Sequence, residues 1–365
     1  MVLDRLILTN FKNYSETDID MCGNVNCFIG NNGAGKTNLL DAVYYLSFCK
    51  SYFNPVDTQN IRTGEEYFAL HGHYGDTQYS CIVRRGQAKQ MRMGRKTYKT
   101  LAEHIGKVPL VMITPSDQTL ITGGSDGRRK FVDGVISQTN HTYLERLIQY
   151  NKALEQRNRL LKQMWEDRIW EEAMVSIWDE QLVRNGEYLY NARQQFVAQF
   201  SPLFEEYYHA IAGSEEPGNI AYQYDNRPLD EQLLDSRQND KYAQYTTCGP
   251  HKDDFVFSLN GEMTVKRFGS QGQQKSFALA LKLAQFQYLN DNLNEKPILL
   301  LDDIFDKLDM LRVRQLIALV GSERFGQVLL TDTQPGRVQA IFDELPQLEH
   351  RVFHVEKGVV RELGR

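Results

Sequence analysis

The sequence contains a glycine-rich segment whose residue types and spacing suit phosphate binding. Residues 30–37 follow the pattern G-x-x-x-x-G-K-[ST]. An apolar run over 25–29 precedes this segment and a helical pattern over 38–48 follows it, which predicts a strand, a tight turn and a helix N-terminus. Backbone N–H groups in such a turn can point at one anion, because glycines carry no Cβ and a helix N-terminus favours negative charge. We therefore expect a phosphate cradle made of Gly30, Asn31, Asn32, Gly33, Ala34, Gly35, Lys36, Thr37 and Asn38.

Two neighbouring carboxylates far downstream could complete a nucleotide site. Four aliphatic residues over 298–301 precede Asp302 and Asp303, and such a run is typical of a central parallel strand covered on both faces. We expect Lys36 to reach the β- and γ-phosphates, Thr37 and Asp302 to hold Mg²⁺, and Asp303 to polarise the attacking water. Two solvated acids at a strand end are the plainer interpretation, which the cradle disfavours. The predicted catalytic residues are Lys36, Asp302 and Asp303.

A second candidate anion site lies at the start of another helix. Ser270 precedes a long helical pattern over 276–289 and is a natural N-cap, with Gly272 and Gln273 beside it. One chain rarely needs two anion sites for one triphosphate. We therefore expect Ser270, Gly272 and Gln273 to contact the γ-phosphate of a nucleotide held by another subunit, so that ATP links two copies of the chain. The alternative is an ordinary capped helix.

Composition limits the class of protein. The chain has 365 residues, of which 41% are hydrophobic and 24% charged, and this suits two domains around a large core. We see no apolar run near the roughly 20 residues of a membrane helix and no signal segment, so we expect a cytoplasmic protein without membrane contact. The five cysteines form no C-x-x-C pair, which disfavours a zinc site.

A local basic segment is the candidate DNA contact. The net charge is −5, so binding to DNA through the whole surface is excluded. Residues 84–99 contain no acid, and strands over 78–84 and 90–93 with a turn at Gly86 predict an antiparallel hairpin. Cations that blunt an edge strand are the alternative. The predicted DNA-binding residues are Arg84, Arg85, Lys89, Arg92, Arg95, Lys96 and Lys99. A second cluster, Arg128-Arg129-Lys130, fits a structural role equally well.

The middle of the chain has a helical pattern. Helices are expected over 142–165 and 171–200, with a restart of the chain at Pro202. Strands over 255–259 and 263–268 would form a hairpin around the Asn260-Gly261 turn. The residues expected to face inward are Leu144, Leu147, Ile148, Leu154 and Leu161 in the first helix, and Ala173, Met174, Ile177, Trp178 and Leu182 in the second.

These patterns predict an α/β protein of two domains. A mainly parallel core sheet with an antiparallel N-terminal sheet would form an ATPase head from residues 1–120 and 241–365. A helical second domain would be inserted over 121–240.

The order of these motifs resembles the ABC-type ATPase heads. More narrowly, it resembles the RecF family of bacterial recombination-mediator ATPases, which are related to SMC and Rad50 heads. The likeness covers most of the chain and is carried by residues 10–14 (NFKNY), 30–40, 249–254 (GPHKDD), 270–283 and 297–309. Lys12 stands where the family usually has Arg. Thr331-Asp332-Thr333 occupies the place of the transporter switch histidine, and Gln118 is the candidate Q-loop residue.

The resemblance implies a role in recombinational repair and replication restart. It implies a P-loop ATPase head of the ABC type, ATP and Mg²⁺ as cofactors, and a weak, DNA-stimulated ATPase activity. It further implies an ATP-driven homodimer that binds duplex DNA near single-strand gaps and acts with RecO and RecR to load RecA. The alternative is a cytoplasmic ABC ATPase coupled to a protein or transport partner, which the long helical insertion disfavours.

Overall fold

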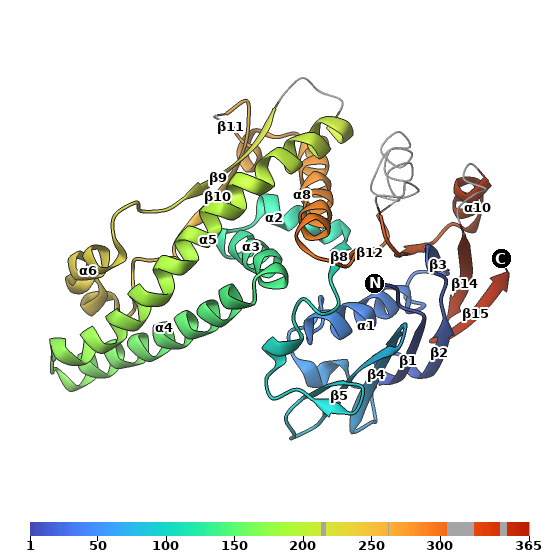
Figure 1. Cartoon of the computed structure of the whole chain (residues 1–365), viewed down its shortest axis with the longest axis horizontal. Coiled ribbons are helices and arrows are strands. Elements are labelled where there is room, and N and C mark those ends of the chain that lie inside the picture. Colours follow the sequence, from blue (N-terminus) through green and yellow to red (C-terminus); the bar gives the residue numbers. More distant parts are fainter. Residues whose placement is uncertain (213–216, 262, 305–324, 344–348, 365) are drawn as a thin grey trace. The chain divides into compact units, whose positions relative to one another are not determined.

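The computed structural model describes residues 1–212, 217–261, 263–304, 325–343 and 349–364 (Figure 1). The chain divides into two compact units, a head unit of Met1–Asp117 with Gln285–Arg365 and a helical unit of Gln118–Ala284. The boundary near residue 117 lies close to the expected one. The second boundary falls within helix α8, Gln271–Asn292, so residues 241–284 belong to the helical unit and not to the compact head.

The head unit contains the expected mainly parallel sheet. Its strand order is β15-β14-β3-β13-β12-β8, in which β15 is an antiparallel edge and the other strands are parallel to one another. Every residue of β3, β8, β12 and β13 is buried, which confirms that 298–301 is a central strand. The strands are β3 Val25–Ile29, β8 Leu110–Ile113, β12 Ile298–Leu301, β13 Val328–Asp332, β14 His350–Glu356 and β15 Val359–Gly364.

A second, antiparallel sheet comes from the N-terminal part of the chain, as expected. Its order is β2-β1-β4-β5-β6-β7, with β1 Arg5–Phe11, β2 Tyr14–Asp20, β4 Tyr67–Tyr74, β5 Thr77–Arg84, β6 Gln90–Met93 and β7 Lys96–Thr97. Helix α1, Lys36–Phe48, contacts strands of both sheets. It is buried on most sides, as a helix between two sheets must be. Further helical elements among the described residues are η1 Asp57–Asn60, η2 Leu101–His104, η3 Pro115–Gln118, α10 Pro335–Asp343 and the last part of α8.

His104 makes the stability of the head unit depend on pH. Its side chain is fully buried, its Nε2 lies 2.6 Å from the Leu46 carbonyl oxygen, and burial lowers its pKa to about 4. The unfolded chain therefore binds a proton more readily than the folded one. We expect the free energy of unfolding to be constant above pH 6.5 and to fall as the pH drops towards 4, by up to about 3 kcal/mol from this residue.

Urea unfolding at pH 7.5 and pH 5 measures this dependence. His104→Gln is expected to flatten it. An equally steep decrease in His104→Gln would contradict the assignment.

The helical unit combines long helices with a small sheet. Its α-helices are α2 Thr119–Thr122, α3 Ser125–Thr139, α4 His141–Asp167, α5 Glu172–Ala212, α6 Leu229–Ala243, α7 Val265–Phe268 and the first part of α8. The strands β9 Gly218–Gln223, β10 Asp254–Leu259 and β11 Met263–Thr264 form an antiparallel sheet in the order β11-β10-β9. Helices α4 and α5 lie side by side (Figure 1), which confirms the expected helical hairpin.

The expected inward faces of α4 and α5 are partly wrong. Leu161 and Leu182 are buried, but Ile148, Met174 and Ile177 are exposed by 48%, 45% and 60%. The buried faces carry charged residues instead. The Arg157 guanidinium is fully buried. Its Nε lies 2.7 Å from Asp179 Oδ1, and its Nη1 lies 2.6 Å from Asp240 Oδ2. A prediction from apolar residues alone does not identify a buried helix face that is held together by ion pairs. The buried residues are Tyr143, Tyr150, Ala153, Arg157, Leu161 and Met164 in α4 and, in the first half of α5, Val175, Asp179, Leu182, Asn185, Gly186, Leu189 and Tyr190.

Two expected boundaries are also wrong. Helix α5 continues through Pro202 to Ala212. Proline removes one intrahelical hydrogen bond, but Phe200 and Phe204 on either side of it are both buried, so packing outweighs that loss. The expected strand over 263–268 ends at Thr264, and Val265–Phe268 forms the short helix α7.

Candidate nucleotide site

The cradle lies between β3 and α1, as the sequence predicts. A Cβ at Gly30 would collide with the carbonyl oxygen of Val355, and one at Gly35, where φ is +118°, would collide with the Asn13 side chain. Glycine is therefore required at both positions. Lys36 Nζ donates to the carbonyl oxygens of Gly30 at 2.8 Å and Asn31 at 3.1 Å, so its ammonium lies within the loop.

The cradle and the carboxylate pair meet at the carboxyl edge of the parallel sheet. Thr37 Oγ1 donates to Asp302 Oδ1 at 2.9 Å, although the two residues are 265 positions apart. The Asp302 side chain is buried. Burial raises the pKa of this carboxyl, and the hydrogen bonds from Thr331 and Thr37 oppose the rise. Asp303 follows with φ at +49°, in the left-handed region that Asp tolerates better than most residues.

Thr331 is a site residue whose role the sequence patterns did not predict. Its Oγ1 donates to Asp302 Oδ1 at 2.9 Å and accepts from the Asp303 backbone N–H at 2.9 Å. The strand order explains this position, because β13 lies between β3 and β12. Thr331 therefore holds the Asp302 carboxylate and the Asp303 backbone from the strand next to β3. The sequence did hold one indication of this role, because Thr331 occupies the place in the motif order where transporters have the switch histidine.

The turn between β1 and β2 supports the cradle from the side. Asn13 Nδ2 donates to the Ala34 carbonyl oxygen at 3.1 Å, and Asn38 Nδ2 donates to Asn13 Oδ1 at 2.7 Å. Tyr14 Oη donates to the Gly35 carbonyl oxygen at 3.0 Å. Residues 10–14, which carry part of the family resemblance, are therefore physically tied to the phosphate loop.

The signature segment forms the start of α8. Ser270 Oγ accepts from the Gln273 backbone N–H at 3.2 Å, and Gln273 Oε1 accepts from the Ser270 N–H at 2.7 Å. These reciprocal bonds are a capping box, which confirms Ser270 as the N-cap. Ser270 is exposed and Gly272 half-buried. Gln118, the candidate Q-loop residue, donates through Nε2 to Gln274 Oε1 at 3.1 Å. Residues 305–309, the end of the segment 297–309 that carries part of the resemblance, lie outside the described residues.

The basic hairpin, residues 84–99, has the expected antiparallel strands β5 and β6. Lys89 differs from the rest of this group. Its ammonium is half-buried, pairs with Asp57 at 2.7 Å and donates to the Cys49 carbonyl oxygen at 2.5 Å, so it is anchored to the interior and is not part of the exposed surface. Arg92 is half-buried and donates to Gln90. The exposed cations are Arg84, Arg85, Arg95, Lys96 and Lys99.

Residues 249–254 are a junction within the helical unit. The sequence suggests little for them beyond a turn leading into a strand. Arg193 on α5 lies 3.5 Å from the Asp253 carboxylate and donates to the Pro250 carbonyl oxygen at 2.7 Å. Arg128 on α3 pairs with Asp254 at 2.8 Å. The segment thus connects two helices to β10, and Arg128 of the second basic cluster has a structural role.

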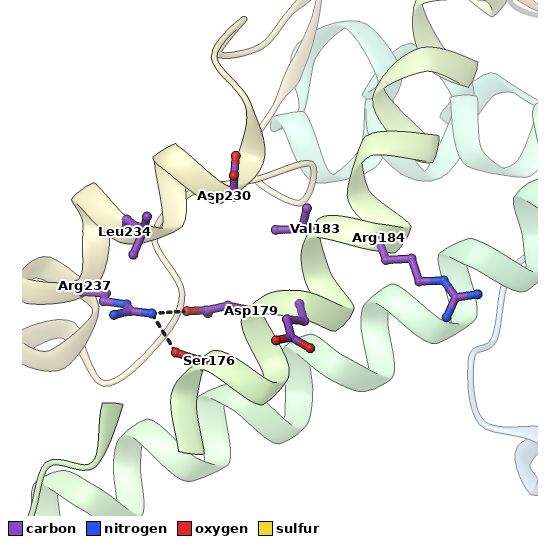
Figure 2. Close-up of a pocket in the computed structure, with 8 residues that line it drawn as sticks. Ser176, Asp179, Val183, Arg184, Asp230, Leu234 and Arg237 are labelled. Atoms are coloured by element: carbon purple, nitrogen blue, oxygen red, sulfur yellow. Dashed lines mark hydrogen bonds and ion pairs between the residues drawn. The ribbon is translucent and has the colours of Figure 1, made fainter. Parts of the chain in front are cut away.

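The helical unit also has a pocket of about 360 Å³ between α5 and α6 (Figure 2). Figure 2 shows Arg237 reaching from α6 towards Asp179 and Ser176 on α5, to which its Nη2 donates at 3.2 and 3.0 Å. Asp179 thus pairs with both Arg237 and Arg157. This pairing gives the pocket a structural explanation without a ligand.

Comparison with known sequences places the chain in a family. A family model described as "AAA domain" matches residues 5–345. "DNA replication and repair protein RecF" of Phocaeicola vulgatus is 46% identical over 372 aligned positions, covering 99% of this chain and 98% of that protein. The protein of the same name from Flavobacterium johnsoniae is 44% identical, covering 97% of this chain and 100% of that protein.

Solved structures agree with this placement. "Structure of the recombination mediator protein RecF-ATP in RecFOR pathway" matches with a TM-score of 0.90 and 28% identity, covering 100% of this chain and 98% of the other. An Smc head bound to the C-terminal winged-helix domain of ScpA matches with a TM-score of 0.59 and 14% identity, covering 100% and 97%, which shows a shared fold. Among the described residues, no helix is long and apolar enough to cross a membrane. The chain belongs to the RecF family of DNA replication and repair proteins.

Proposed function

We propose that this chain is an ATP-dependent DNA-binding switch of recombinational repair and replication restart. The observation that carries the proposal is the set of hydrogen bonds that joins Thr37, Asp302 and Thr331 at the edge of the parallel sheet, next to the ammonium of Lys36. Lys36, Thr37 and Asp302 are of the residue types that bind the phosphates and the metal ion in P-loop proteins, and Thr331 holds Asp302 in place. The ATP-bound structure of a RecF protein supports ATP as the nucleotide.

The residues fit a magnesium ion. Thr37 Oγ1 and Asp302 Oδ1 lie 2.9 Å apart. Neighbouring oxygen ligands around an octahedral Mg²⁺ lie about 3 Å apart, because each bond is about 2.1 Å long. When bound, Mg²⁺ would neutralise charge on the phosphates. Thr37 and Asp302 would orient it, and Asp303 would orient the attacking water.

The capped, exposed Ser270 supports an ATP-linked dimer. A serine hydroxyl at the exposed start of a long helix suits an incoming anion, because a helix N-terminus favours negative charge. In the proposed dimer, each ATP would be held by the cradle of one copy and by Ser270, Gly272 and Gln273 of the other. ATP would favour the dimer and hydrolysis would release it.

The proposed DNA contact is the basic hairpin, now restricted to its exposed cations. Family membership supports a preference for duplex DNA near single-strand gaps, and action with RecO and RecR to load RecA.

The test is the rate of ATP hydrolysis with gapped DNA, with plain duplex and without DNA. We expect a weak basal rate that gapped DNA increases most. A rate that no DNA changes would reject the switch and favour the alternative, an ATPase coupled to a protein or transport partner.

Salt dependence tests the basic hairpin. Neutralising Arg84, Arg85, Arg95 and Lys96 together should flatten the slope of log affinity against log salt by roughly 0.9 for each lost phosphate contact on duplex DNA. The loss should be similar for all sequences, because phosphate contacts do not read bases. The measurement is DNA affinity at several salt concentrations.

The matched control neutralises two exposed cations of the helical unit, Arg159 and Lys162, which already pair with acids on α4. We expect this control to keep the wild-type slope. An unchanged slope in the fourfold hairpin variant would reject the hairpin as the DNA contact.

A further inference from the structure

The segment that follows α1 folds back against that helix and is held in place at several points. Ser51 Oγ donates to Asp41 Oδ2 at 2.6 Å, and the Tyr52 backbone N–H donates to Asp41 Oδ1 at 2.7 Å. Asp41 lies on α1, one turn beyond Thr37. The Tyr52 hydroxyl donates to Asp117, which follows β8, the strand that pairs with the end of β12 before Asp302. Residues 51–53 are thus fixed near the carboxyl edge of the parallel sheet.

The next residue, Phe53, is more exposed than the aromatic side chains around it. The rings of Tyr44, Phe48 and Tyr52 are at least half-buried against one another, whereas Phe53 is 42% exposed. Its ring contacts Tyr52 edge to face, with the centroids 5.2 Å apart. Phe53 therefore has a fixed ring with an open surface.

Lys12 connects Phe53 to the cradle. Lys12 Nζ lies 5.6 Å from the Phe53 ring centroid and 2.6 Å from Asp41 Oδ2. The next residue along the chain, Asn13, is bonded to the Ala34 carbonyl oxygen of the cradle. The turn that supports the phosphate loop thus also carries the cation that lies over the Phe53 ring.

We infer that Phe53 stacks against the purine base of the nucleotide whose phosphates the cradle binds. This inference rests on the proposed ATP binding. In the proposed site, the cradle, Lys36 and Asp302 bind only the phosphates and the metal ion. Recognition of the base therefore needs another group near them. Every base has a π-face, and a rigid aromatic ring can bind it without ordering a flexible side chain. The contact adds affinity for a nucleoside triphosphate over a bare triphosphate.

Two probes separate base binding from phosphate binding, namely MgATP and magnesium tripolyphosphate, which has no base. Phe53→Ala is expected to bind ATP about tenfold more weakly, within the range known for stacking contacts, and to keep the wild-type affinity for tripolyphosphate. The control Leu363→Ala removes an exposed apolar side chain from β15 and should change neither affinity. Calorimetric titration measures the affinity of each of the two variants for each of the two probes.

A second variant reports the contact directly. Phe53→Trp should keep the wild-type ATP affinity, and its added fluorescence should be quenched by ATP and not by tripolyphosphate. Quenching by single-stranded DNA in place of ATP would assign the ring to a DNA base and overturn the inference.

Other results would also overturn it. Unchanged ATP affinity in Phe53→Ala, or an equal loss for both probes, would show that the ring does not bind the base. Failure of the wild-type protein to bind ATP would reject the proposed function and this inference together. If the wild-type protein binds ATP and Phe53→Ala binds it equally well, only the inference is rejected.

Discussion

Lys36→Ala is expected to abolish ATP binding and ATP-driven dimerisation together while the protein remains folded. The ammonium lies within the loop, 2.8 and 3.1 Å from two of its carbonyl oxygens, where the phosphates of a bound nucleotide would compete for it. Charge-assisted hydrogen bonds contribute about 1.5–3 kcal/mol each, so we expect at least a loss of about a hundredfold in ATP affinity. Titration with a fluorescent ATP analogue is the measurement.

The control is Lys107→Ala, which removes an exposed ammonium from the same unit. It should bind ATP normally, and both variants should have thermal unfolding midpoints close to that of the wild type. Normal ATP affinity in Lys36→Ala would reject the cradle assignment, because the role assigned to this ammonium is to bind the phosphates.

The cradle and its flanking elements were predictable because their signals are local. A glycine pattern, the apolar run of 25–29 and the helical pattern of 38–48 each specify their own conformation. The buried strand over 298–301 was equally clear, because four aliphatic residues in a row suit a strand covered on both faces. These elements were confirmed with boundaries within about two residues, the accuracy expected of such assignments.

The role of Thr331 was not predictable from its neighbours in the chain. It depends on β13 lying between β3 and β12, and strand order is decided by packing across the whole sheet. The same limit applies to Lys89. Its charge suggested a DNA contact, but a nearby carboxylate, Asp57, holds it in the interior.

Helices α4 and α5 show where an apolar pattern misleads. The periodicity located both helices but placed Ile148 and Ile177 on the buried face, and they are exposed. The interior is closed by Arg157 with Asp179 and Asp240. Breaking a buried pair costs about 3–5 kcal/mol, so such residues define the core as firmly as leucines do, and a hydrophobicity scale cannot identify them.

Asp303→Asn is expected to separate binding from hydrolysis. Asparagine tolerates the left-handed conformation that Asp303 adopts at φ +49°, so the backbone bond to Thr331 should persist. The variant lacks the negative charge that would polarise water. A positioned general base contributes about a hundredfold or more to a rate. We therefore expect normal ATP binding, hydrolysis slower by at least that factor, and an ATP-linked dimer that lasts longer than the wild-type dimer.

Ser270→Arg should produce the opposite separation, ATP binding without dimerisation. Ser270 is exposed in the single chain, so a larger side chain fits there, and loss of the N-cap bond costs about 1 kcal/mol. In the proposed dimer the arginine would occupy the space of the other copy's γ-phosphate. Light scattering with and without ATP distinguishes the variants, with Asp303→Asn as the positive control for a dimer. An ordinary ATP-driven dimer of Ser270→Arg would show that the start of α8 does not bind the nucleotide of a second copy.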